Sequence, residues 1–121
     1  MNKRIRSGLT LMLTALTLLA PAGNQAFAAN CSMENYDHNG SVMEVSRCGG
    51  GSVVITYVQP RSGLARIGVR NGSLLFQGVE KANGVIHGEA RKFSRRCGQN
   101  IYSISGRDNG NSIVFQGSAP V

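Results

Sequence analysis

The chain has 121 residues, with 13 lysines and arginines against six aspartates and glutamates, and a formal net charge of +7 at pH 7. Tryptophan is absent and aromatic residues make up only 6%, so the core is expected to be small and a covalent crosslink would help to stabilise it. The basic residues are dispersed, and no run of them is long enough to indicate binding to nucleic acid.

The first 28 residues have the features of a secretory signal peptide. Three basic residues within the first six positions precede the apolar run Leu9–Ala20, which is short for a transmembrane helix. Residues 26–28 (Ala-Phe-Ala) match an A-x-A cleavage site. We expect cleavage after Ala28, with residues 1–28 outside the fold, and a soluble, exported, periplasmic protein that is not inserted in a membrane.

Removal of residues 1–28 would leave 93 of the 121 residues, which we interpret as a single β domain, 29–121. Three of the 13 basic residues lie in the signal, so ten basic and six acidic residues remain, a net charge of about +4. A retained signal anchor is one alternative. A lipoprotein is another, because Cys31 follows the signal closely, although Asn30 stands where a lipobox has a small residue.

Short runs rich in Val, Ile, Phe and Tyr, separated by Gly, Asn and Ser, indicate strands, and no long helical periodicity occurs. We expect strands at Ser41–Arg47, Ser52–Val58, Ser73–Gln77, Val85–Phe93, Ile101–Ser105 and Ser112–Gln116. Turns are expected at 37–40 and at the Asn-Gly pairs 71–72, 83–84 and 109–110, and a flexible tip at 49–51. The fold class is therefore all-β, a small antiparallel meander closing into a barrel or a curled sheet.

Two segments of the chain, 71–78 and 109–117, resemble each other. In each, an Asn-Gly turn is followed by an apolar strand that ends in Phe-Gln-Gly. Similar hairpins demand similar residues, and a duplicated meander unit is the alternative explanation.

The three cysteines can be assigned to ends of such a meander, because successive connections alternate between the two ends. If the strand at Ser41 is the first, Cys31 and Cys97 lie at one end and Cys48 lies at the other. A disulfide needs Cα atoms within about 7 Å, so we expect a Cys31–Cys97 bond with Cys48 as the odd thiol. Cys48–Cys97 remains the alternative pair, and Cys48 on a flexible tip is also compatible with a homodimer.

The same alternation predicts a positively charged end. The loop Gln59–Val69 and the connection Ser94–Asn100 should lie side by side there. The arginines concerned are Arg61, Arg66, Arg95 and Arg96. They form either a binding surface or an ordinary solvated rim.

The chain lacks the patterns of a catalytic or metal site. His38 falls in a turn and His87 in a strand, and neither belongs to a catalytic motif. A GxSxG sequence is absent, the cysteines and histidines lack zinc-ligand spacing, and the few acidic residues are scattered. We therefore predict a protein that is not an enzyme and uses neither a metal nor a cofactor.

The segment Tyr57–Gly78 resembles the periplasmic C-type lysozyme inhibitors, which are small exported β-barrels. Their Ser-Gly-x-x-Tyr loop corresponds to residues 62–66 (Ser-Gly-Leu-Ala-Arg), and their strand ending in Thr-Lys-Gly corresponds to residues 76–78 (Phe-Gln-Gly). Arg66 stands where the family has Tyr, and Gln77 stands where it has Lys.

The resemblance implies a periplasmic inhibitor that inserts the Pro60–Arg66 loop into the cleft of a C-type lysozyme. Ser62 would contact the catalytic carboxylates, and Gly63 would permit the close approach. The remaining implied contacts are Arg61, Leu64 and Arg66 in the loop, with Arg95 and Arg96 as a supporting basic rim. Arg66 or Lys81 would replace the basic residue of the family.

The chain is also similar to a small domain of exported proteobacterial proteins, in which Pro-Arg-x-Gly-Leu and Phe-Ser-Arg-Arg-Cys-Gly loops recur. Residues 60–64 and 93–98 match those loops. That similarity implies no particular function. The alternative function is a periplasmic binding module for an anionic glycan or envelope polymer, which would use the same basic rim, and a purely structural envelope protein is a third interpretation.

Overall fold

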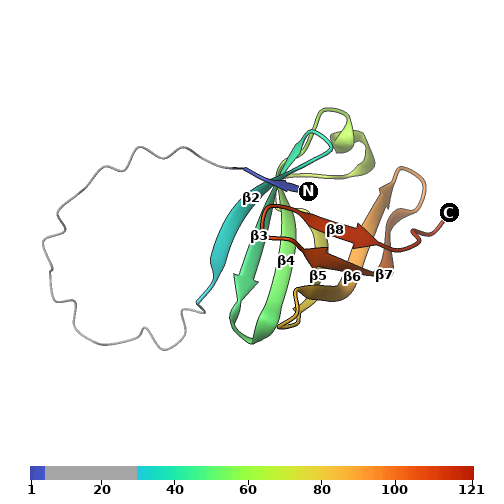
Figure 1. The fold of residues 1–121 in the computed structure, drawn as a ribbon. Coiled ribbons are helices and arrows are strands. Elements are labelled where there is room, and N and C mark those ends of the chain that lie inside the picture. The colour runs from blue at the N-terminus through green and yellow to red at the C-terminus, as the bar shows by residue number, and fades with distance from the viewer. Residues whose placement is uncertain (5–29) are drawn as a thin grey trace, which may run out of the picture.

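The computed structural model describes residues 1–4 and 30–121, and Figure 1 shows its strands curling into a nearly closed barrel with one seam. Each strand pairs antiparallel with the next in the chain, in the order β1 to β8. The strands are β1 (Asn2–Lys3), β2 (Ser32–His38), β3 (Ser41–Cys48), β4 (Ser52–Gln59), β5 (Leu74–Glu80), β6 (Val85–Ser94), β7 (Gly98–Asp108) and β8 (Ile113–Gln116). Two short 3-10 helices, η1 (Gly49–Gly51) and η2 (Leu64–Ile67), interrupt the connections.

The prediction of an all-β antiparallel meander is confirmed, and all six expected strands are present. The strand β2 was not expected. Its sequence, Ser-Met-Glu-Asn-Tyr-Asp-His, contains no Val or Ile, and only Tyr36 is fully buried. Pairing with β3 along its whole length holds it extended. The turn is consequently shorter than expected, with Asn39 and Gly40 at φ 49° and 85°.

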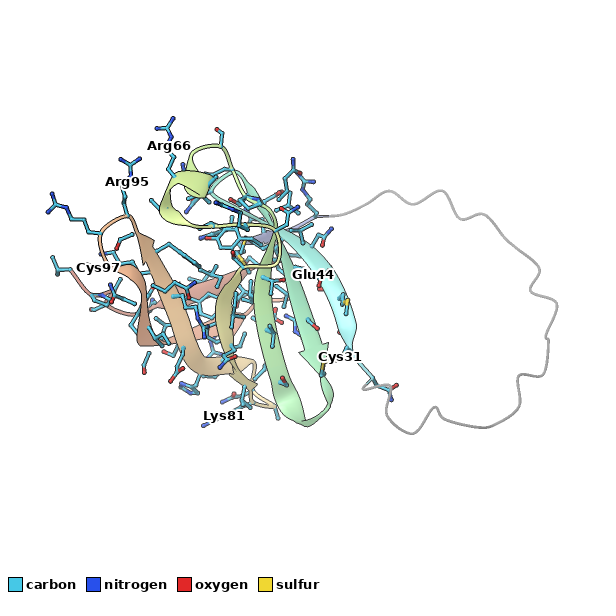
Figure 2. The ribbon with its side chains drawn as sticks, turned by 180° about the vertical axis from the view of Figure 1, so that it is seen from behind. Cys31, Glu44, Arg66, Lys81, Arg95 and Cys97 are labelled. Atoms are coloured by element: carbon cyan, nitrogen blue, oxygen red, sulfur yellow. A yellow bond between two sulfur atoms is a disulfide. The ribbon has the colours of Figure 1, made fainter. Side chains whose placement is uncertain are left out.

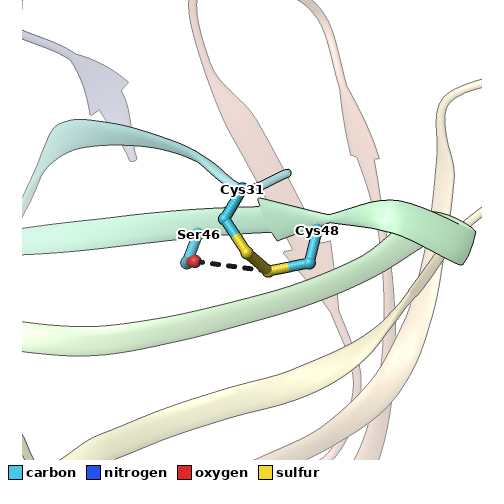
Figure 3. Close-up of a disulfide and its surroundings, with 3 residues drawn as sticks. All are labelled: Cys31, Ser46 and Cys48. Carbon is cyan, nitrogen blue, oxygen red and sulfur yellow. Dashed lines mark hydrogen bonds between the residues drawn. A yellow bond between two sulfur atoms is a disulfide. The ribbon is translucent and has the colours of Figure 1, made fainter. Parts of the chain in front are cut away.

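The structure contradicts the predicted Cys31–Cys97 disulfide, because the bond joins Cys31 to Cys48 (Figure 3). Ser32 pairs with Arg47 across the β2–β3 hairpin. Cys31 precedes Ser32 and Cys48 follows Arg47, so the two cysteines face each other, with Cα atoms 4.1 Å apart. The prediction counted strands from Ser41 and so assigned Cys31 to the wrong end. The thiol left over is Cys97, which is exposed.

The core fills the inside of the barrel with side chains from alternate strand positions. Its fully buried members include Tyr36, Met43, Val45, Val53, Ile55, Val69, Phe76, Ile86 and Ile113. The two similar segments contribute one aromatic ring each. The rings of Phe76 on β5 and Phe115 on β8 pack with centroids 4.9 Å apart. The repeated Phe-Gln-Gly sequence thus supplies both halves of one core contact.

Two glycines let β5 and β6 lie close together beneath the ring of Phe76. Gly78 and Gly88 are paired across these strands. A Cβ atom on Gly88 would lie 2.6 Å from the Cα of Gly78 and 2.7 Å from Cζ of Phe76. No side chain fits there without displacing the ring, so the curl of the sheet at this point depends on glycine.

The seam of the barrel lies between β2 and β8, where the first residues of the full chain are inserted. Asn2 and Lys3 form β1, which pairs with β2, and Asn2 also bridges to Ser112. The first four residues therefore pair with the barrel in the full chain, and the division into residues 1–28 and a domain 29–121 stays a prediction. The apolar run of the expected signal and its cleavage site fall outside the described residues, and cleavage after Ala28 stays a prediction.

Candidate functional site

The connection between β4 and β5 is a loop that is fastened at both ends. At its start, the backbone N–H of Arg61 donates to the hydroxyl of Ser41, which is buried at the first position of β3. At its end, Tyr57 and the Gly72–Ser73 backbone exchange two hydrogen bonds of 2.9 and 2.7 Å. The loop therefore leaves the barrel from a closed base.

The middle of the loop is folded on itself around η2. Gly63 and Gly68 flank this helix, both at φ 92°, a conformation that side chains other than glycine rarely adopt. Val69 is 1% exposed and belongs to the core. The guanidinium Nη1 of Arg70 donates to Ala65 O at 2.9 Å and so ties the two sides together. These contacts give the loop a fixed shape.

The residues expected to bind lysozyme divide into two groups. Arg61, Ser62, Gly63 and Arg66 are exposed at the loop surface. Leu64 is half-buried and packs against the core. Leu64 therefore anchors the loop. Less of its side chain is accessible to a partner than the sequence suggested.

The connection between β6 and β7 lies at the same end of the barrel as this loop, as the meander requires. Figure 2 shows Arg66 and Arg95 projecting from that end. Arg95 and Arg96 are both exposed in the turn after Ser94. We call Arg61, Arg66, Arg70, Arg95 and Arg96 the basic end.

The basic end carries positive charge that is not neutralised internally. All six acidic residues of the sequence lie in the described part of the chain, and within that part the ion pairs involve only Lys3, Arg4 and Arg47 as cations. Arg70 is engaged in hydrogen bonds within the loop. The other four arginines of the basic end are thus available to bind anionic groups of another molecule.

Lys81 does not belong to this surface. It lies in the turn between β5 and β6, and Figure 2 places it at the end of the barrel opposite Arg66. Lys81 therefore cannot take the place of the inhibitor family's basic residue beside Ser62. Arg66 is the remaining candidate for that role. Gln77 is exposed in the middle of β5, at neither end.

His38 lies beside the base of the loop. Burial lowers its pKa from the usual 6.5, and the positive charges of the N-terminal amine and Arg61 lower it further. The side chain is half-buried, so it favours the neutral form and adds no charge to the basic end near neutral pH.

Three of the acidic residues that are scattered in the sequence converge, at one end of the barrel, on Arg47. Its Nη2 lies 2.6 Å from Asp108 Oδ2, its Nε 3.2 Å from Glu80 Oε2, and its Nη1 3.6 Å from Glu34 Oε2. We call these four residues the Arg47 cluster. Burial alone would lower the pKa of Arg47, but hydrogen bonds to Tyr36 and Glu80 raise it overall.

Sequence reasoning missed the Arg47 cluster because its members come from four different strands. Only the strand register brings them together, at the β3 C-terminal end of the barrel. It also missed Ser41, whose buried hydroxyl holds the loop, because a serine after a turn gives no sign of burial in the sequence.

Among residues 1–4 and 30–121, no group of three or more His, Cys, Asp and Glu side chains is placed to hold a metal ion. No helix in this part of the chain has the length and apolarity to cross a membrane. Comparisons with protein-family models, curated proteins and solved structures found no match for the chain.

Proposed function

We propose that the protein inhibits C-type lysozymes in the periplasm by inserting the exposed tip of the β4–β5 loop into the enzyme cleft. The observation that carries this proposal is the fixed shape of the loop, with Ser62 and Gly63 exposed at its tip between Arg61 and Arg66. A loop that is already ordered loses little conformational entropy on binding.

The chemistry of the tip suits the carboxylates of a glycosidase. A lysozyme cleft contains two carboxyl groups that act on the glycosidic bond. The hydroxyl of Ser62 and the guanidinium of Arg66 can each donate hydrogen bonds to a carboxylate, and Gly63 has no side chain to obstruct the approach. Hydrogen bonds to charged groups contribute about 1.5–3 kcal/mol each. Such contacts would block the sugar from both catalytic groups.

The test is an assay of cell-wall lysis by a C-type lysozyme in the presence of the exported protein. We expect inhibition by the wild type, and an inhibition constant at least about 100-fold higher for the Ser62→Ala, Arg66→Ala double variant, because two charge-assisted contacts are lost. Lys81→Ala is the matched control, since it removes an exposed basic residue from the opposite end of the barrel. Full inhibition by the double variant would refute the role of the loop.

A second candidate is binding of an anionic glycan or envelope polymer at the same end. Arg95 and Arg96 favour it, because both are exposed in the β6–β7 turn and extend the positive charge beyond the loop tip. Polymer binding should weaken strongly with salt, as contacts between arginines and a polyanion do. If lysozyme activity is unaffected and the protein binds an anionic polysaccharide in a salt-sensitive manner that Arg95→Ala weakens, this candidate replaces the first.

A further inference from the structure

The seam between β2 and β8 has two edges. Its β8 edge offers main-chain hydrogen-bonding groups to an inserted strand. In the full chain, the N-terminal amine of Met1 donates to Ile113 O and the N–H of Ile113 donates to Met1 O, at 3.0 Å each. The N–H of Lys3 donates to Asn111 O at 2.7 Å. These groups of Ile113 and Asn111 would be unpaired edge groups if residues 1–4 were removed.

The β2 side of the seam offers a matching edge. Tyr36 and Asp37 pair with β1, and Asn35 O accepts a hydrogen bond from the N–H of Arg4 at 2.9 Å. A segment of four residues is therefore held by main-chain hydrogen bonds on both of its edges. This is the geometry by which an added strand completes a sheet.

The side chains of the inserted strand occupy sites of different chemistry. Met1 packs against the core and lines a cavity of about 400 Å³ that also borders on Phe76. Lys3 Nζ lies 2.9 Å from Glu34 Oε1, and Arg4 Nε lies 2.7 Å from Asp37 Oδ1. The seam thus accepts an apolar residue, followed two and three positions later by basic residues.

The acidic character of the seam extends inward, because Glu34, which pairs with Lys3 at the seam, also belongs to the Arg47 cluster. Without Lys3, that cluster holds one guanidinium against three carboxylates. The excess of negative charge lies where the ammonium of Lys3 is seated in the full chain. A basic side chain at this position would be favoured by charge complementarity.

We propose that, once residues 1–28 are removed, the seam between β2 and β8 binds an extended basic segment of a partner protein by strand addition. This inference rests on cleavage after Ala28, and it uses none of the residues of the basic end. The chain's own C-terminal tail is directed elsewhere, since Pro120 O accepts a hydrogen bond from Lys92 on β6.

The test begins with export of the full chain by a bacterial host and a mass measurement of the purified product. Binding of the tetrapeptide amide Met-Asn-Lys-Arg is then followed by NMR. We expect saturable shifts of the amide signals of β2 and Ile113, and none with Met-Asn-Glu-Glu. Glu34→Gln should weaken binding about fivefold or more, because it removes one charged contact. Glu89→Gln, an exposed carboxylate on β6, is the matched control and should bind as the wild type does.

Three results would overturn the proposal. The first is an exported protein that retains residues 1–4. The second is a cleaved protein whose β2 and β8 amide signals do not shift when the basic peptide is added. The third is a dimer in which a second copy fills the seam, seen as a doubled mass in solution. The Ser62→Ala, Arg66→Ala variant should bind the peptide normally, so failure of the loop proposal and failure of the seam proposal give different results.

Discussion

Replacement of Arg47 by methionine tests the Arg47 cluster as the main polar support of the barrel interior. The side chain of Arg47 is 22% exposed, and those of Asp108 and Glu80 are 16% and 20% exposed. Removing one partner of a fully buried ion pair costs about 3–5 kcal/mol, because the other charge is left without compensation. Since these groups retain some contact with solvent, we expect Arg47→Met to lower the free energy of unfolding by about 2–3 kcal/mol.

The measurement is urea unfolding followed by far-UV circular dichroism with the disulfide intact. With a dependence of about 1 kcal/mol per M urea for a domain of this size, the midpoint should fall by about 2–3 M. Adding Glu80→Gln and Asp108→Asn to Arg47→Met should recover part of the loss, because the unpaired carboxylates are removed. The control is Arg107→Met, an exposed arginine on β7 that should change stability by less than about 0.5 kcal/mol.

The reasoning would be refuted by an Arg47→Met variant as stable as Arg107→Met. It would also fail if the triple variant were less stable than Arg47→Met alone, since the carboxylates would then not be the source of the penalty. Both comparisons use the same chain and the same transition, so they do not depend on the absolute value of the free energy of unfolding.

Three further predictions concern the covalent link, the sheet and the histidine. Replacing Cys31 and Cys48 by serine should lower the free energy of unfolding by roughly 3 kcal/mol, as expected for a loop of 17 residues; a change below about 1 kcal/mol in urea titrations would contradict this. Gly88→Ala should cost about 2 kcal/mol or more by the same assay, because its Cβ would collide with the backbone of Gly78 and with the ring of Phe76, and a neutral effect would contradict the close approach of β5 and β6. The pKa of His38, measured by NMR in the full chain, should lie below 6.5; because the folded value is below the unfolded one, its contribution to stability is complete above about pH 6.5 and is lost as the pH falls through the folded value. A pKa above 6.5 would contradict the assigned burial.

Local sequence signals predicted much of the fold, because hairpins depend on neighbouring residues. The Asn-Gly pairs adopt the expected turns, with Gly72, Gly84 and Gly110 at positive φ, and the Val- and Ile-rich runs are strands. The strand β2 escaped prediction because its extended shape comes from pairing with β3, not from its own residues. One missed strand was enough to reverse the end assigned to Cys31.

The candidate site was predicted only in part, for the same physical reason. The β4–β5 loop and the turn containing Arg95 were expected at the same end of the barrel, and the topology brings them there. Both come after Ser41 in the chain, and the number of strands from Ser41 onward was predicted correctly. The shape of the loop was not predictable. It depends on the buried hydroxyl of Ser41 and on Val69, whose burial requires the closed barrel.

Positive charge without a carboxylate partner is concentrated at the basic end, and this separates the two proposed functions by the sign of a salt effect. At the other end, the carboxylates of the Arg47 cluster are paired with Arg47. A basic lysozyme would be repelled by the basic end at long range, so added salt should speed its association with the loop while leaving the local contacts in the cleft. A polyanion is attracted by the same end, so added salt should slow its association and weaken its binding. Association rates measured at two salt concentrations, with Arg95→Ala as the variant that reduces the long-range charge, therefore distinguish the two partners independently of the lysis assay.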